Sequence, residues 1–211
     1  MDEREDDLRL LKAWAEGDKQ AGGTLIRRHF PTLRRFFINK VPEVDVADLI
    51  QTTFMECTKS LSRFRGDSTF RTFLLAIARH MLLKYYREHG RKHGRLDPLT
   101  HSVAQVSTRG LFTRLGLADD SSLLLSALRQ LSIDQQIALE LKYWEGLTAR
   151  ESAVILGIPD TTVRSRLVRG RRELGRIVSS MRDGSTPRGH VDDVQSWIQE
   201  IHELLGGDPK A

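Results

Sequence analysis

Cysteine is almost missing from this chain of 211 residues, which carries a single thiol at Cys57. One cysteine cannot form a disulfide within the chain, so the class of small disulfide-stabilised secreted proteins is excluded. Cys57 follows a series of apolar residues at helical spacing. We therefore expect a buried or half-buried thiol in a helix, without a redox role.

Long apolar runs are also missing. No stretch approaches the roughly 20 apolar residues that a membrane-spanning helix needs. The chain opens with the acidic sequence MDEREDD, which is the opposite of a secretory signal. The sequence therefore predicts a cytoplasmic protein without a membrane partner.

The motifs of common catalytic sites are absent as well. The chain has no P-loop, no Rossmann glycine pattern and no nucleophile elbow. His89 and His93 stand four residues apart, but no third metal ligand accompanies them. We expect no metal site, no cofactor and no catalysis by this chain.

Positive charge is what the chain has in excess. The formal net charge is +5 and the isoelectric point is about 9.6. Residues 79–95 contain six Lys or Arg and one Glu, and residues 161–182 contain seven Arg and one Glu. Two separate basic segments predict two contacts with nucleic acid.

Apolar residues recur at helical spacing along most of the chain, and strand-like alternation is absent. The predicted fold is all-α, with two small helical domains joined by a flexible linker. The expected divisions are a first domain over 5–90, a linker over 91–120, a second domain over 121–178 and a C-terminal extension over 179–211. An amphipathic helix is predicted over 191–205 in the extension; it docks on the same protein or, alternatively, binds a separate partner.

The stretch from Leu147 to Leu174 predicts a helix-turn-helix. Thr148 and Glu151 have the spacing of a capping box, which starts a helix. Gly157 suits the left-handed residue that ends it. Asp160 is the expected cap of the second helix, and Val163 is its apolar plug.

The second helix of this motif is predicted to turn its basic residues outward. They are Arg164, Arg166, Arg169, Arg171 and Arg172, together with Ser165. Such a helix fits the major groove of DNA, where its first turns read base edges. The alternative is a surface helix with a solvated basic face. The capped turn and the apolar plug favour DNA binding.

Aromatic and basic residues alternate in the segment from Phe64 to Arg87. Cations bind a nucleic-acid backbone, and aromatic faces accommodate unstacked bases. The alternative is ordinary helix packing, which we favour for Phe70, Phe73, Ile77 and Met81 because they repeat as a core face. For the loop over 65–69 and the basic end of the helix, we favour nucleic acid.

Three stretches, 45–54, 62–87 and 128–174, stand in the order and spacing of a known family. They include DVADLIQTTF, FRGDSTFRTF and LTARESAVILGIPDTTVRSRL. The chain resembles the extracytoplasmic-function sigma factors of bacterial RNA polymerase. The resemblance implies a transcription initiation factor that binds core RNA polymerase, recognises the −35 and −10 elements of promoter DNA and helps to open it.

The resemblance also implies roles for particular residues. The residues expected to bind core polymerase are Asp48, Leu49, Gln51 and Phe54. Those expected at the −10 element are Arg65, Gly66, Asp67, Ser68, Thr69, Arg79, Lys84 and Arg87. Those expected at the −35 element are Arg150, Arg164, Ser165, Arg166 and Arg169, of which Arg150 and Arg166 hold phosphate.

The sequence departs from the family at Thr52, where Glu is usual, and this puts one polar contact to the polymerase in doubt. The extension beyond residue 179 is longer than usual, so an anti-sigma factor or the extension itself is a candidate regulator. A polymerase-independent regulator with a helix-turn-helix and a helical adaptor for acidic proteins are the rival readings. The basic, aromatic loop beside a polar helix argues against both.

Overall fold

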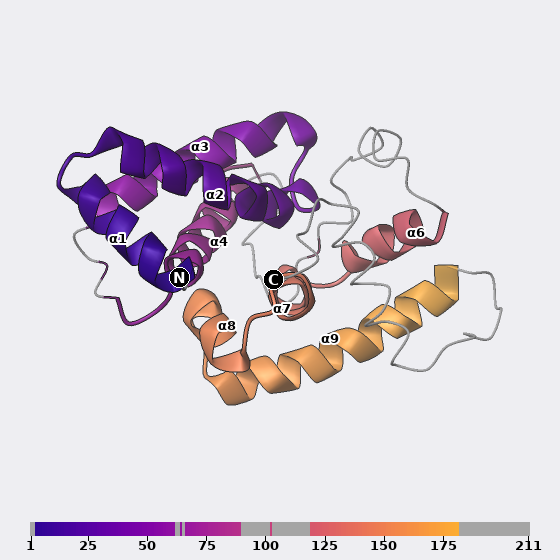
Figure 1. The fold of residues 1–211 in the computed structure, drawn as a ribbon. Coiled ribbons are helices and arrows are strands. Elements are labelled where there is room, and N and C mark those ends of the chain that lie inside the picture. Colours follow the sequence, from indigo (N-terminus) through magenta and orange to yellow (C-terminus); the bar gives the residue numbers. More distant parts are fainter. Residues whose placement is uncertain (1–2, 62–63, 65, 90–101, 103–118, 182–211) are drawn as a thin grey trace.

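The computed structural model describes residues 3–61, 64, 66–89, 102 and 119–181. These residues form eight α-helices and no strand, apart from an isolated bridge between Ser102 and Ser132 (Figure 1). The predicted all-α class is therefore confirmed. The helix predicted over 191–205 and nearly all of the linker lie outside the described residues, and the domain boundaries stay predictions.

Four helices make the first half of the molecule: α1 (Glu3–Ala15), α2 (Lys19–Ile38), α3 (Glu43–Ser60) and α4 (Phe70–His89). Short polar side chains and prolines set where they begin. The Asp18 carboxylate accepts the backbone N–H of Gln20 at 2.8 Å, which caps α2. Helix α3 follows Pro42, and the Thr69 hydroxyl accepts the N–H of Thr72 at 3.1 Å at the start of α4.

The core of the first half includes Leu25 and Phe37 from α2 and Leu74 from α4, all without exposed surface. Burying each such side chain contributes roughly 1.5–3 kcal/mol. Helices α1 and α2 approach closely because Gly22 lies under the indole of Trp14. A Cβ at Gly22 would stand 2.5 Å from the indole nitrogen, so only glycine fits there.

The second half consists of α6 (Asp119–Leu128), α7 (Ile133–Tyr143), α8 (Ala149–Leu156) and α9 (Asp160–Met181). Ser132 starts α7 with a capping box, and Thr148 starts α8 in the same way. Gly157 ends α8 with a φ of 64°. The features at Thr148 and Gly157 confirm the sequence prediction. The prediction for Asp160 was off by one residue, because it is the first residue of α9 and the Pro159 carbonyl accepts the N–H of Val163.

The two halves pack directly against each other. Helix α4 lies on α8, and Figure 1 shows α7 end-on between the first half and α9. One buried apolar cluster runs through both halves and includes Phe70, Leu74, Ile137 and Ile155. The sequence predicted two domains on a linker that allows them to separate. The sequence did not predict that the described parts of the two domains pack on each other through this shared core.

Candidate nucleic-acid interface

The helix-turn-helix presents polar side chains on the first turns of α9. Arg164 is exposed and donates to the Asp160 carboxylate at 3.3 Å, one turn earlier. Arg169 is exposed and donates to the Ser165 hydroxyl at 3.2 Å. Arg150 is exposed at the start of α8. Arg164 and Arg169 of the second helix are therefore exposed, as the sequence predicted, and Ser165 is half-buried, while Val163 is fully buried as the apolar plug.

The prediction that Arg166 faces outward was wrong. Its side chain is only 10% exposed, and its guanidinium donates to Asp134 Oδ2 of α7 at 2.9 Å. Position 166 lies one turn before Gly170, which packs on Leu139 of α7. Helical periodicity therefore places Arg166 on the inner face, and arginine is tolerated there because a carboxylate meets it.

The loop before α4 combines conformational freedom with small polar groups. Gly66 has a φ of +78° and open space around it, Asp67 is exposed, and Ser68 is half-buried. The Thr69 hydroxyl lies 2.9 Å from that of Thr72. Arg65 lies outside the described residues. The structure thus brings four of the five predicted loop residues together at the start of α4.

The cations predicted on α4 divide into two groups. Lys84 and Arg87 are exposed near the C-terminal end of the helix. Arg79 is only 18% exposed, and it donates to Asp134 Oδ1 at 3.0 Å. Of the aromatic residues in this segment, Phe70 is buried, and Phe64 and Phe73 lie against each other with ring centroids 5.0 Å apart. The packing interpretation is therefore right for Phe70.

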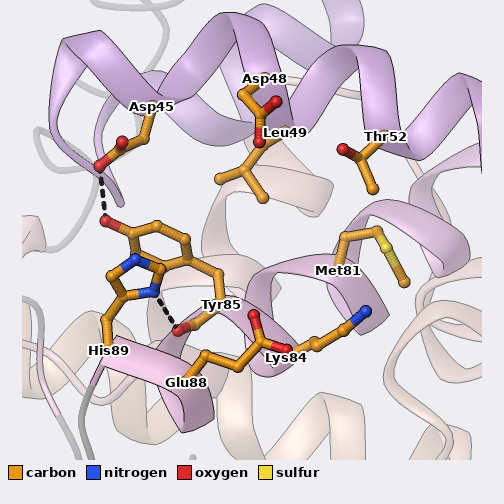
Figure 2. A pocket seen from close by; sticks show the side chains of 9 residues that line it. All are labelled: Asp45, Asp48, Leu49, Thr52, Met81, Lys84, Tyr85, Glu88 and His89. Carbon is orange, nitrogen blue, oxygen red and sulfur yellow. Dashed lines mark hydrogen bonds between the residues drawn. The ribbon is translucent and has the colours of Figure 1, made fainter.

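A groove separates α3 from the C-terminal half of α4 (Figure 2). The Tyr85 hydroxyl donates to the Asp45 carboxylate at 2.6 Å across the groove, and the His89 ring stacks on Tyr85. Burial is the main cause that raises the pKa of the Tyr85 phenol, and the bond to Asp45 adds to it. Tyr85 therefore remains a hydrogen-bond donor at neutral pH.

The residues predicted to bind polymerase fall on two sides of α3. Asp48 and Gln51 are exposed, and Asp48 lines the groove with Thr52. Leu49 also lines the groove, although it is 6% exposed. Phe54 is 7% exposed and belongs to the buried cluster, and its contact with polymerase stays a prediction. Its side chain packs α3 onto the core.

Sequence reasoning missed a group of buried acidic residues in and beside α7. They are Asp134, Glu140 and Glu145, each at most 6% exposed. Burial lowers the pKa of Lys40 and raises that of Glu140, since both charges have left water. The signal in the sequence was Lys40 itself, a charge inside the apolar run from Phe36 to Val41. Such a charge requires a buried partner.

The chain matches two sequence families that describe parts of one kind of protein. "Sigma-70 region 2" matches residues 25–92, and "Sigma-70, region 4" matches residues 121–174. The ECF RNA polymerase sigma-E factor of Escherichia coli strain K12 is 29% identical over 190 residues, which cover 86% of this chain and 98% of that protein. The corresponding factor of Haemophilus influenzae is 28% identical over 179 residues, with coverages of 81% and 94%.

Solved structures share the fold. The structure of CnrH in complex with the cytosolic domain of CnrY has a TM-score of 0.63 at 24% identity, and covers 83% of this chain and 98% of that one. The sigma factor RpoE of Bartonella quintana, in complex with the anti-sigma factor NepR, has a TM-score of 0.58 at 22% identity, with coverages of 74% and 96%.

The chain therefore belongs to the extracytoplasmic-function sigma factors, which direct RNA polymerase to initiate transcription at specific promoters. Among the described residues, no helix combines the length and apolar character that a membrane span requires.

Proposed function

We propose that α8 and α9 recognise the −35 element, with Arg164, Ser165 and Arg169 at the base edges and Arg150 on phosphate. The observation that carries this proposal is the exposure of Arg164 and Arg169 on α9, with the half-buried Ser165 bonded to Arg169. In a helix-turn-helix, the first turns of the second helix enter the major groove. In this proposal Arg166 contacts phosphate only after its ion pair with Asp134 has broken.

The loop over 65–69 and the exposed end of α4 form the −10 surface in this proposal. An unstacked base requires space next to small polar groups, and Gly66, Ser68 and Thr69 provide both. Lys84 and Arg87 supply positive charge for the backbone of the opened strand. This surface captures the separated strand and so helps to open the DNA.

The groove between α3 and α4 is the proposed docking site for core polymerase. Asp48 and Gln51 offer exposed polar groups at one side, and Leu49 lines the groove behind them. Thr52, at the position where the family usually has Glu, gives a shorter and neutral contact. The chain works in the cytoplasm in this proposal, because core polymerase is there, and it leaves catalysis to the polymerase.

An anti-sigma protein is a further proposed partner. The support is that RpoE of Bartonella quintana, which shares this fold, forms a complex with the anti-sigma factor NepR. A protein that co-purifies with the chain and prevents its binding to core polymerase would support this. A co-purifying protein without that effect would contradict it.

The test of the −35 assignment is transcription by core polymerase loaded with Arg164→Ala or Arg169→Ala, on promoters selected from a random library. Each change should cost about 1–3 kcal/mol of promoter binding and relax the preference at one position of the element. Arg172→Ala is the matched control, since Arg172 is also exposed on α9 but lies beyond the first turns. Uniform weakening on all sequences would indicate contact with phosphate alone.

Gel filtration with core polymerase separates this function from that of a polymerase-independent regulator. Co-elution of the full chain is expected. If the chain binds a duplex operator tightly but fails to co-elute, the docking proposal for α3 and α4 is wrong.

A further inference from the structure

The acidic first turns of α1 are bonded to one turn of α2. The Asp7 carboxylate accepts the Arg28 guanidinium on Oδ1 and the imidazole Nε2–H of His29 on Oδ2, the latter at 2.7 Å. A carboxylate only accepts, so Nε2 carries the hydrogen of this bond. Asp6, the neighbour in sequence, accepts Arg28 and Arg9, each at 2.6 Å. Of these two carboxylates, Asp7 is therefore the one that holds the imidazole.

The pair of Asp7 and His29 is buried, with only 4% and 3% of the two residues exposed. Polar groups are costly to bury, and a buried pair often gives no more net stability than apolar side chains of the same volume. What the bond supplies is orientation, because it fixes how the imidazole ring stands between the helices. This orientation matters because of the next neighbour of the ring, Phe70.

The His29 ring stands edge-on to Phe70, with ring centroids 5.1 Å apart and an interplanar angle of 70°. Phe70 is the first residue of α4 and directly follows Thr69, the last residue of the proposed −10 loop. The Thr69 carbonyl accepts the N–H of Phe73 at 3.1 Å, which ties Thr69 to the first turn of α4. Asp7, His29 and Thr69 also line one cavity. A movement of the imidazole ring would therefore reach the loop through a single residue.

We propose that His29, oriented by Asp7, is a positioning residue for the −10 loop. The proposal rests on the proposed function of that loop. Gly66 stands in open space within the loop, so the loop depends on its ends for a defined position. The His29 ring fixes the end at Phe70, and with it the small polar groups that meet an unstacked base. Helix α1 thus takes part in −10 recognition without contacting DNA.

The test measures two preferences of core polymerase loaded with the full chain, on promoters selected from a random library. One is the preference for the selected −10 base over a substituted base, and the other is the same ratio at the −35 element. Asp7→Ala removes the acceptor of the imidazole, whereas Asp7→Asn keeps an oxygen that accepts it. Asp6→Ala is the matched control, because it removes a carboxylate of the same turn but leaves the bond between Asp7 and His29 in place.

Asp7→Ala should lower a −10 preference on the order of tenfold to about twofold, since a misplaced loop loses its contact with the base. The −35 preference should stay unchanged, and Asp7→Asn and Asp6→Ala should keep both preferences. A general loss of folding reduces the amount of active complex and not the ratio between two promoters. An unchanged −10 preference in Asp7→Ala, an equal loss at both elements, or an equal loss in Asp6→Ala or Asp7→Asn would overturn the proposal.

A double-mutant cycle tests the contact between the ring and α4. His29→Gln keeps an N–H for Asp7 but removes the ring, and Phe70→Leu removes the aromatic partner. The two losses of −10 preference should not multiply in the double variant, because each breaks the same contact; independent losses would refute it. Phe36→Leu, which breaks another edge-on pair in α2, is the control and should keep the preference. Co-elution with core polymerase and the −35 ratio show separately whether the sigma function itself fails.

Discussion

Helices α3 and α7 are both rich in acidic residues, but they use them in opposite ways. Asp48 of α3 is exposed along a groove, and Glu56 bonds to Lys59 one turn away. Asp134 and Glu140 of α7 are buried and bond to cations of the other half. Exposed carboxylates are available to another protein, whereas buried ones are already used. Location, and not residue type, separates a docking surface from an internal contact.

The largest effect is expected from Lys40→Met, which leaves Glu140 buried without its cation. Breaking a buried pair from one side typically costs about 3–5 kcal/mol, so the free energy of unfolding should fall by that amount in urea denaturation. Adding Glu140→Leu should restore most of it.

Lys59→Met is the matched control in α3, because Lys59 pairs with Glu56 at the surface. It should leave the unfolding curve unchanged. If Lys40→Met and Lys59→Met lower the free energy of unfolding equally, buried and exposed ion pairs do not differ in their contribution to stability here.

A smaller effect, on binding and not on stability, is expected from Asp48→Lys in α3. Reversal of an exposed charge at an interface mainly changes association, so the affinity for core polymerase should fall about tenfold. Glu16→Lys, an exposed reversal away from the groove, is the control. If Asp48→Lys lowers the free energy of unfolding but leaves the affinity for polymerase normal, Asp48 makes an internal contact, as the acidic residues of α7 do.

The smallest effect is expected from Tyr85→Phe, which removes the bond to Asp45 at the edge of the groove. One partly exposed hydrogen bond to a carboxylate should be worth about 1 kcal/mol in urea denaturation. A double-mutant cycle with Asp45→Ala isolates the pair, because alanine has no oxygen that could accept the Tyr85 hydroxyl. Additive losses in the cycle would show that the bond contributes nothing.

Local rules were enough to predict the elements of the fold. The capping box at Thr148 and the left-handed Gly157 depend only on neighbours in sequence, and the structure has both. The inward position of Arg166 was missed because six arginines within 164–176 suggested an outer face. Its partner is 32 residues earlier in the chain, and sequence spacing does not show that distance.

The contact between the halves was missed for the same reason. Lys40 and Glu140 are 100 residues apart, and a linker of flexible composition lies between them. Each charge alone is compatible with a helix surface. Only the three-dimensional structure, in which the turn after α2 meets α7, shows that they form a pair.

The burial of Arg166 also bears on where molecules of this factor are found in a cell. A genome offers about 10⁶–10⁹ non-specific sites, and exposed arginines bind them through phosphate. In the structure Arg79 and Arg166 are hydrogen-bonded to Asp134. These two side chains are therefore not free to bind the phosphates of bulk DNA. We therefore expect weaker non-specific binding to bulk DNA than the net charge alone suggests.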